Sequence, residues 1–346
     1  MKVLEKTEFQ KEHVRLDLRD KKIIKLLSLN ARFPLTLIAK HVRLTRDAVK
    51  YRIERLEQNE VLTGYLSLVN LKKLGWSSYH VFLELHANPE KEAEWVGFLK
   101  KHGNVNAILK YSGKLDYELA IISRDFQEFD KVLQEITQKY PVKDYEILIL
   151  LETLKSSTFP EKLLDEKMHL IEGKHDGSFA KEFSHASSAY EPDKKDLQIL
   201  RILAEDARIQ LVGLAGKIGL SQDAVAYRIK KMIHSRILLE FRPVINFSRL
   251  GFYVYTVLLR LENLMDESWE GMKSFIKNHP NILWAVKTIG KWNILFYVIT
   301  QNEEEFHATM AEFKKRFAAI IKSYEALLAS EEYKYTYFPE AVTSSR

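Results

Sequence analysis

The chain has 346 residues, of which 46% are hydrophobic, with only 13 Gly and 8 Pro; this composition predicts several folded domains and excludes a disordered or fibrous chain. It has no cysteine, which excludes disulfides and thiolate metal sites, and no secretory signal or membrane-length apolar run, so we expect a cytoplasmic protein. Lys and Arg number 53 against 47 Asp and Glu, and the net charge of +6 permits an acidic partner such as DNA without requiring one.

The sequence contains a tandem duplication. Residues 30–57 align with 206–233 at a constant offset, and between 20–85 and 196–261 about 22 of 66 positions are identical, where unrelated sequences would share roughly 4. The match resumes downstream as KYSGKLDYELAIIS against KTIGKWNILFYVIT. Residues 161–192 match nothing and have the Gly, Ser and Pro content of a linker. The chain is therefore predicted to contain two copies of one unit.

Each unit begins with three short predicted helices. Asp20 and Thr45 are placed to cap the first and third helix, and Ser221 repeats the position of Thr45 in the second copy. The few residues between the second and third helix fit the turn of a helix-turn-helix, and residues 61–75 predict a short wing or connecting strand pair. The apolar residues at helical spacing in the first copy are Ile23, Ile24, Leu26, Leu27, Leu35, Ile38, Ala39, Val49, Ile53 and Leu56.

The rest of each unit alternates between strand and helix. In the first copy, strands are predicted over 78–86, 105–113, 116–123 and 144–154 and helices over 94–102 and 129–140, which is the order βαββαβ of a ferredoxin-like domain. The predicted fold class is α+β, with a duplicated unit of winged helix-turn-helix followed by βαββαβ. The expected divisions are an N-terminal extension (1–16), a winged helix-turn-helix (17–70), a βαββαβ domain (71–160), the linker (161–192), a second winged helix-turn-helix (193–246) and a second βαββαβ domain (247–340).

The third helix of each unit is the predicted DNA-recognition helix. With its apolar residues turned to the core, Arg46 and Lys50 fall on its outer face, where basic side chains can meet phosphates and base edges. A merely solvated helix face is the alternative. The candidate DNA-binding residues are Arg43, Thr45, Arg46, Lys50, Arg52 and Arg55 in the first copy and Ser221, Gln222, Arg228, Lys230 and Lys231 in the second.

The two recognition helices differ in charge. Gln222 stands in place of Arg46, and Ala226 in place of Lys50, so we expect the first helix to make more phosphate and guanine contacts than the second. Arg52 and its counterpart Arg228 are identical, and either contact with DNA or an internal salt bridge would explain them.

The ordered set of residues resembles the leucine-responsive regulatory protein (Lrp/AsnC) family of transcription regulators, in a two-copy, archaeal-type version. The resemblance implies a DNA-binding domain joined to a βαββαβ domain of the RAM type for effector binding and dimerisation, double-stranded DNA as partner, and an amino acid as candidate effector. It rests on Asp20, Asn30-Ala31-Arg32, Ile38-Ala39, Val49, Arg52-Ile53, Leu56, Leu74-Gly75 and Gly113-x-x-Asp116-Tyr117, and on the counterparts Asp196, Asp206-Ala207-Arg208, Leu214-Ala215, Val225, Arg228-Ile229, Leu250-Gly251 and Gly290.

The turn at residues 113–116 joins two predicted strands. A glycine there can take a positive φ and a short carboxylate can bond the backbone, which explains the turn structurally. The resemblance implies in addition that the loop lies beside an effector cleft, with Gly113, Asp116, Gly290 and Asn293 as candidate effector-binding residues. Because Asn293 lacks the carboxylate, we expect Asp116 to contribute more to binding an amino group.

Two functions from other classes compete with a DNA-binding regulator. Siroheme decarboxylases have a similar duplicated architecture, but the His- and Arg-containing stretch associated with their site is absent around residues 279–292. A ligand-sensing protein that has lost DNA binding is the other alternative. We expect no catalytic residue, cofactor or metal, because there is no phosphate-binding Gly-rich loop and because His169, His175 and His185 lack metal-ligand spacing.

The duplication also predicts the assembly. A linker of about 32 residues spans up to roughly 100 Å when extended, so it can hold the two copies together at high effective concentration. We therefore expect one chain to form an internal pseudo-dimer, which in turn is a candidate for a larger homo-oligomer.

Overall fold

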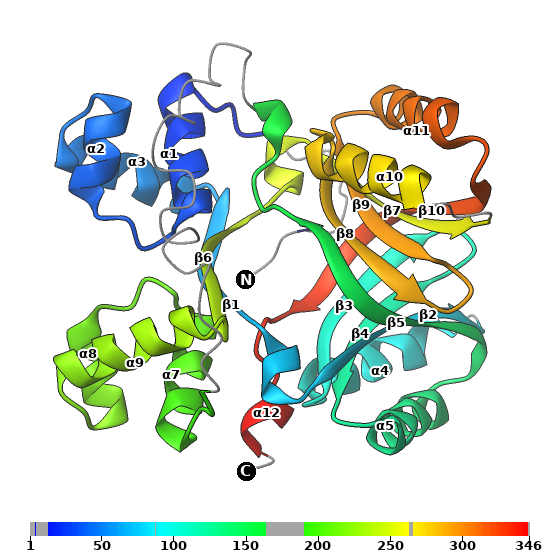
Figure 1. Ribbon diagram of the computed structural model, residues 1–346, viewed down its shortest axis with the longest axis horizontal. Coiled ribbons are helices and arrows are strands. Elements are labelled where there is room, and N and C mark those ends of the chain that lie inside the picture. The colour runs from blue at the N-terminus through cyan, green and yellow to red at the C-terminus, as the bar shows by residue number, and fades with distance from the viewer. Residues whose placement is uncertain (1–3, 5–12, 87, 164–189, 263–265, 345–346) are drawn as a thin grey trace.

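The computed structural model describes residues 4, 13–86, 88–163, 190–262 and 266–344 (Figure 1). Most of the predicted linker, with His169, His175 and His185, lies outside these residues. No helix in the described ranges is long and apolar enough to cross a membrane. The first unit comprises α1 (Leu18–Leu29), α2 (Leu35–Val42), α3 (Arg46–Gln58), β1 (Leu62–Val69), β2 (Ser77–Leu85), α4 (Pro89–Lys101), β3 (Val105–Ser112), β4 (Tyr117–Ser123), α5 (Phe126–Lys139) and β5 (Val142–Ser156).

The second unit repeats the order of the first, which confirms the predicted fold class. Its helices α10 and α11 correspond to α4 and α5. Its elements are α7 (Lys194–Glu205), α8 (Leu211–Ile218), α9 (Gln222–His234), β6 (Leu238–Ile245), β7 (Tyr253–Leu261), α10 (Asp266–Asn278), β8 (Ile282–Ile289), β9 (Ile294–Thr300), α11 (Glu303–Phe317) and β10 (Ile321–Tyr335), followed by α12 (Ala341–Ser344).

The helix caps follow the sequence with one correction. Thr45 and Ser221 cap α3 and α9, and each side-chain oxygen accepts the N–H of the residue three positions on, at 3.2 Å. The prediction that Asp20 caps α1 is wrong. Asp17 is the N-cap and Asp20 lies in the first turn, because the two form a capping box in which each side chain accepts the other's N–H. Both oxygens of Asp20 also accept hydrogen bonds from α3.

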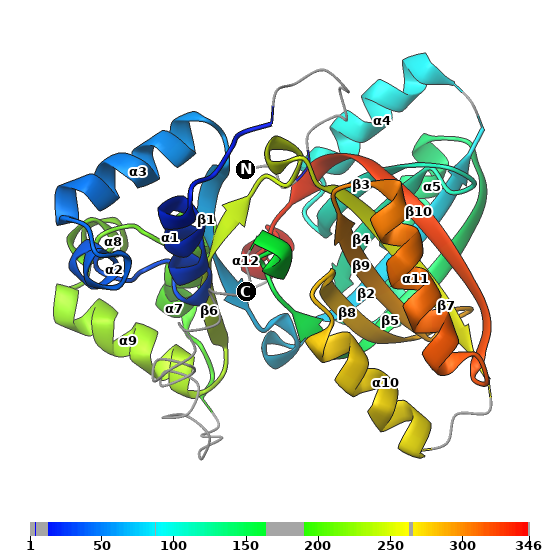
Figure 2. The same cartoon turned by 90° about the horizontal axis from the view of Figure 1, so that it is seen from above.

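The two βαββαβ domains share one closed barrel of eight strands, in the order β10-β3-β4-β2-β5-β8-β9-β7 (Figure 2). β5 and β10 are each 15 residues long, and each pairs with a strand of its own unit along one half and with a strand of the other unit along the rest. Helices α4, α5, α10 and α11 pack on the outside. One chain thus supplies both halves of a dimer-like unit, as the duplication predicts.

The strands that follow the recognition helices pair across the two units. β1 and β6 form a two-stranded antiparallel sheet, in which Leu66 lies opposite Arg242. The expected wing is therefore not a hairpin within one unit, because the partner of each strand comes from the other copy. Figure 1 shows this sheet between the two helix-turn-helix units, with the barrel to one side.

Two half-buried lysines join the units in a reciprocal way. Lys155 of β5 donates to the carbonyl of His279 at the end of α10 (2.7 Å), and Lys334 of β10 donates to the carbonyl of His102 at the end of α4 (2.9 Å). Each lysine therefore satisfies a carbonyl at a helix C-terminus of the other unit. Burial lowers the pKa of both lysines to about 8, and the carboxylates of Glu161 and Glu340 oppose this shift only in part.

These two lysines predict a rise in stability with pH. In the unfolded chain each keeps its proton up to about pH 10.5, whereas the folded chain releases it near pH 8, so the cost of burying the charge is present below pH 8 and disappears between pH 8 and 10.5. We expect the free energy of unfolding of the unaltered chain to rise, relative to a Lys155→Met, Lys334→Met double variant, by on the order of 1 kcal/mol per lysine between pH 8 and 10. Denaturant titrations at several pH values measure this difference, and parallel curves would contradict the assignment.

Candidate DNA-binding interface

The outer face of α3 carries accessible charged side chains. Arg46 and Lys50 are 62% and 58% exposed, and their ion pairs are confined to the same helix, Arg46 with Asp47 (3.5 Å) and Lys50 with Glu54 (3.7 Å). Exposed ion pairs of this kind contribute little to stability, so they can be exchanged for a phosphate at small cost. Both basic side chains are therefore available to an external partner.

The outer face of α9 carries its charge at other positions. Gln222 is exposed at the position of Arg46, and Ala226 is half-buried at the position of Lys50. Lys230 and Lys231 are exposed, and Lys231 Nζ lies 4.9 Å from the ring centre of Tyr190 and 5.5 Å from that of Tyr227. The arrangement of charge thus differs between the two helices: Arg46 and Lys50 have no charged counterparts in α9, whereas Lys230 stands where α3 has Glu54.

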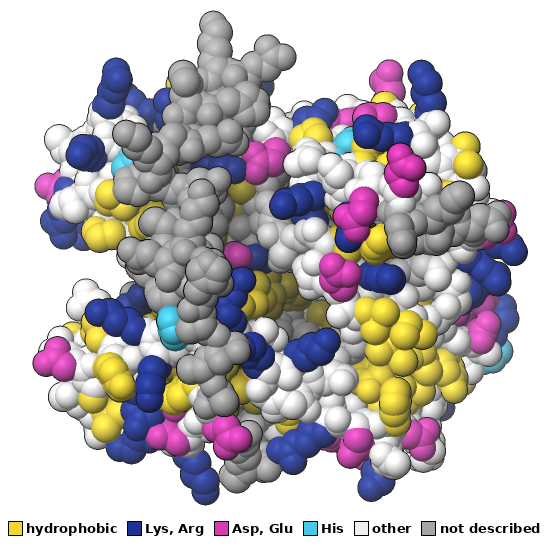
Figure 3. All heavy atoms as spheres, viewed as in Figure 1, with side chains coloured by type: hydrophobic (Ala, Val, Ile, Leu, Met, Phe, Trp, Pro, Cys, Tyr) yellow, Lys and Arg dark blue, Asp and Glu magenta, His cyan; other side chains and the backbone are white. Residues whose placement is uncertain are grey.

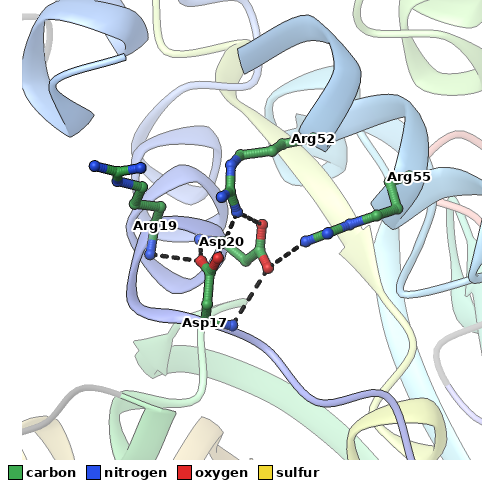
Figure 4. Close-up of polar contacts among 5 residues, drawn as sticks. All are labelled: Asp17, Arg19, Asp20, Arg52 and Arg55. Carbon is green, nitrogen blue, oxygen red and sulfur yellow. Dashed lines mark hydrogen bonds and ion pairs between the residues drawn. The ribbon is translucent and has the colours of Figure 1, made fainter. Parts of the chain in front are cut away.

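Arg52 lies in an internal ion-pair cluster (Figure 4). Its Nη1 donates to Oδ2 of Asp17 (2.7 Å) and to Oδ1 of Asp20 (2.8 Å), while Nη2 of Arg55 donates to the other oxygen of Asp20 (2.7 Å). Asp20 is only 1% exposed. These contacts hold α3 against the N-terminus of α1, which is the internal salt bridge that the sequence left open for Arg52.

The second unit repeats this cluster. Arg228 donates to Asp193 (2.7 Å) and Asp196 (2.9 Å), while Lys231, which replaces Arg55, turns to Tyr190. Burial alone would raise the pKa of the Asp193 carboxyl, but the N–H of Asp196 and the guanidinium of Arg228 outweigh it, so the pKa lies below its ordinary value. Both recognition helices are therefore fixed to the first helix of their unit by the same arrangement.

Arg43 ends α2 in the left-handed region, with φ 54°, and its exposed side chain lies just before α3. The counterpart is Gly219, with φ 70°. The turn itself favours glycine, so Arg43 is present at some cost in backbone strain. The strain at Arg43 is therefore consistent with a role of its side chain outside the turn, such as contact with DNA.

The two helix-turn-helix units are also docked on each other. The N–H of Ala31 donates to the carbonyl of Phe241 in β6 (2.9 Å), and the N–H of Ala207 donates to the carbonyl of Tyr65 in β1 (2.8 Å). Arg32 reaches across to the carbonyls of Ala207 (2.7 Å) and Ile209 (3.1 Å). The Ala-Arg pairs common to both copies thus link each unit to the strand or loop of the other, and they fix the spacing of α3 and α9.

The space-filling view shows where charge and apolar surface gather. In Figure 3, Lys and Arg side chains are distributed over both helix-turn-helix units, and an apolar patch lies on the barrel half of the molecule. The exposed large hydrophobic residues include two on the recognition helices themselves, Tyr51 and Tyr227. This pair is not among the predicted site residues, although the Tyr-Arg-Ile shared by the two copies is the signal in the sequence that could have found it.

The turn after β3 and its counterpart after β8 have the same structural role. Oδ2 of Asp116 accepts the N–H of Leu85, and Oδ1 of Asn293 accepts the N–H of Leu261, both at 2.7 Å. The φ angles of Gly113 and Gly290 are both +145°, and a Cβ on Gly290 would lie 2.5 Å from the carbonyl oxygen of Ile147. Trp292, beside Asn293, is buried and donates to Glu146 of β5 (2.6 Å).

A buried polar network inside the barrel was not predicted. Glu118 is fully buried and accepts hydrogen bonds from Tyr111 and from Tyr297 (2.9 Å), and it also pairs with His80. Tyr111 also contacts the hydroxyl of Thr256 (2.6 Å), so the network joins both units. Burial, reinforced by the charge of Glu118, raises the pKa of Tyr111 and Tyr297 well above the ordinary value. The signal in the sequence was a single acidic residue within the apolar strand 117–123.

Comparison with known proteins agrees with these features. The model of the AsnC-type helix-turn-helix domain matches residues 16–57 and 193–233. The transcriptional regulator LrpA of Pyrococcus horikoshii is 33% identical over 118 residues, which are 34% of this chain and 83% of that protein. The chain belongs to the Lrp/AsnC family. The regulator Ptr1 of Methanocaldococcus jannaschii, another family relative, is 27% identical over 146 residues, 41% of this chain and 97% of its own length.

The duplicated arrangement as a whole also has a counterpart among solved structures. The siroheme decarboxylase NirDL covers 94% of this chain and 96% of its own, with a TM-score of 0.62 and 13% identity. At this identity the likeness concerns the fold alone. It shows that two helix-turn-helix units and two βαββαβ domains can be combined in the same way around one barrel.

The ion-pair cluster of the first unit gives a stability prediction. We expect Asp20→Ala to lower the free energy of unfolding by about 2 to 4 kcal/mol, because it leaves Arg52 and Arg55 without their shared buried partner and removes half of the capping box. Asp223→Ala, which removes an exposed carboxylate from the first turn of α9, should cost less than about 1 kcal/mol. Denaturant unfolding measures both, and equal losses would show that the cluster does not hold α3.

Proposed function

We propose that this chain is a sequence-specific transcription regulator that binds double-stranded DNA with both helix-turn-helix units. The observation that carries the proposal is the pair of recognition helices with outward faces free of core packing, held at fixed spacing by the β1–β6 sheet and the reciprocal Ala31 and Ala207 contacts. Family membership supports the same conclusion, since the relatives LrpA and Ptr1 are named as transcriptional regulators.

The proposal divides the basic residues into two roles. Arg46 and Lys50 contact DNA from α3, together with Arg43 at its preceding turn, while Gln222, Lys230 and Lys231 serve the second unit. Arg52, Arg55 and Arg228 position the helices through their carboxylate partners, and Thr45 and Ser221 act as caps. Because the two outer faces differ, the binding site is expected to consist of two unlike half-sites separated by about one or a few turns of DNA.

The experiment that tests this function is direct. Genome-wide mapping of bound sites, with and without amino-acid supplementation, should give a recurrent motif with two dissimilar halves. Purified protein should shift DNA that contains this motif at low salt. Failure to bind any DNA under these conditions would overturn the proposal and favour a sensor without DNA binding.

Arg46 and Lys50 give a quantitative prediction. Replacing both by Ala should weaken binding strongly and flatten the plot of log affinity against log salt by up to about two phosphate contacts. Gln222→Ala, at the matched position of the second unit, should leave the slope nearly unchanged, and the reciprocal Gln222→Arg, Ala226→Lys variant should steepen it. If the Arg46→Ala, Lys50→Ala variant and the Gln222→Ala variant changed affinity and salt slope equally, or if the bound site were strictly palindromic, the two helices would contact DNA alike and the proposed asymmetry would be wrong.

A siroheme decarboxylase-like enzyme is the second candidate function. Its support is the likeness in fold to NirDL over nearly the whole chain. Heme-type absorbance in the purified protein, or decarboxylation of added siroheme, would favour it over the regulator. We infer the regulator because the relatives of higher identity are regulators and because both AsnC-type helix-turn-helix matches are intact in this chain.

We further propose an amino-acid effector bound near the turn at Asp116, as the family resemblance implies. The carboxylate of Asp116 already accepts a backbone N–H, as Asn293 does, so only its charge distinguishes it from its counterpart. Association of whole chains into a homo-oligomer stays a prediction.

Variants of Asp116 separate structure from ligand binding. Asp116→Ala and Asn293→Ala should each lower the free energy of unfolding by about 1 to 3 kcal/mol, because each leaves a backbone N–H unpaired. Asp116→Asn keeps the acceptor, so we expect native stability with weakened amino-acid binding by calorimetry. Unchanged binding by Asp116→Asn would exclude the carboxylate as partner of the ammonium group, and no binding of any common amino acid by the unaltered chain would remove the effector proposal.

A further inference from the structure

The two recognition helices share six residues at equivalent positions. Five of these identities have a role within the unit. Val49 and Ile53, with their counterparts, are buried in the core. Arg52 and Arg228 form the ion pairs to the first helix. Asp47 and Asp223 lie in the first turn, where a carboxylate interacts favourably with the helix dipole. Ala48 and Ala224 donate their N–H groups to the caps. The sixth pair is Tyr51 and Tyr227.

The tyrosine pair is not explained by packing. Tyr51 is 65% exposed and Tyr227 60%, and neither belongs to a hydrophobic core cluster of the described residues. The ring of Tyr227 contacts Lys231, but Arg55, the counterpart of Lys231, is held by Asp20 instead, so this contact does not account for the pair. An aromatic residue kept at this exposure in both copies, while its charged neighbours diverged, indicates a shared external contact.

The position of the pair suits contact with bases. Tyr51 follows Lys50 directly and lies one helical turn from Asp47, on the exposed face of the first half of α3. The N-terminal half of a recognition helix is the part that reaches base edges in the major groove. A tyrosine ring there presents a flat apolar surface, which matches the 5-methyl group of thymine.

We propose that Tyr51 and Tyr227 are specificity-determining residues that each contact the methyl group of a thymine, one in each half-site. The inference rests on the proposed DNA-binding function. It adds an apolar contact with a base, which the charged residues cannot provide. The two half-sites share a thymine at the position that faces the tyrosine, although they differ at the positions that face Arg46 and Gln222.

The test uses the full chain and a DNA duplex selected by it from a random pool. Each thymine is replaced in turn by deoxyuridine, which removes only the methyl group. We expect one thymine in each half-site to show about fourfold weaker binding on this replacement. Tyr51→Ala should abolish the sensitivity in one half-site and leave the other intact, Tyr227→Ala should do the reverse, and Tyr51→Phe, which keeps the ring, should retain it.

The possible results separate this inference from the function on which it rests. Absence of DNA binding by the unaltered chain would overturn the proposed function. DNA binding with deoxyuridine sensitivity that survives Tyr51→Ala and Tyr227→Ala, or with no sensitivity at any thymine, would overturn the role of the tyrosines and leave the regulator intact. Because both side chains are exposed, the variants should unfold at the same temperature as the unaltered chain, which a thermal melt checks.

Discussion

The antiparallel pairing of β1 with β6 is the interaction on which the placement of both recognition helices depends. Each strand leaves the recognition helix of its own unit and finds its hydrogen-bond partner in the other unit. The first helices cross over in the same way, since α1 packs on β6 and α7 packs on β1. Neither helix-turn-helix is complete without the other copy, and α3 and α9 are held as one body.

The barrel imposes the same dependence on the second half of each unit. A four-stranded βαββαβ sheet on its own leaves two edges unpaired, and unpaired edges invite association. Here the long strands β5 and β10 extend past their own sheets and pair with β8 and β3, so the barrel closes within one chain. Lys155, Lys334 and the network around Glu118 then connect the two sheets through side chains. Closure therefore needs the second copy but no second molecule.

Much of this architecture could be predicted because it is encoded locally. Helical and alternating periodicity gave the elements in order, and the duplication gave the internal pairing. The partner of β1 could not be predicted, because periodicity describes the faces of a strand and not its neighbour. Asp20 was misplaced because Asp17 and Asp20 both suit a cap, and only the turn of the chain before α1 decides between them. The ion pairs of Arg52 and the exposure of Tyr51 depend on how α1 packs against α3. The spacing of residues in the sequence does not determine that packing.

The fusion of the two copies allows them to diverge in a way that a dimer of identical chains cannot. In such a dimer every substitution appears twice, whereas here Arg46 faces outward in one unit and Gln222 in the other. The barrel shows the same freedom. Ile289 at the β5–β8 seam is exposed, and Ser112 occupies its equivalent at the β3–β10 seam. Likewise, α5 begins with Phe126 where α11 begins with Glu303.

What has not diverged is the set of contacts that both units need in order to fold together. Arg52 and Arg228 keep their aspartates, and the Ala31 and Ala207 loops keep their partners on β6 and β1. These contacts fix the distance between α3 and α9, so on the proposed function a change in their outer faces would alter which bases are read without altering the spacing of the half-sites. A covalent pseudo-dimer can in this way recognise an asymmetric DNA site with a nearly symmetric frame, because symmetry is required by the packing of the frame and not by the surface that it presents.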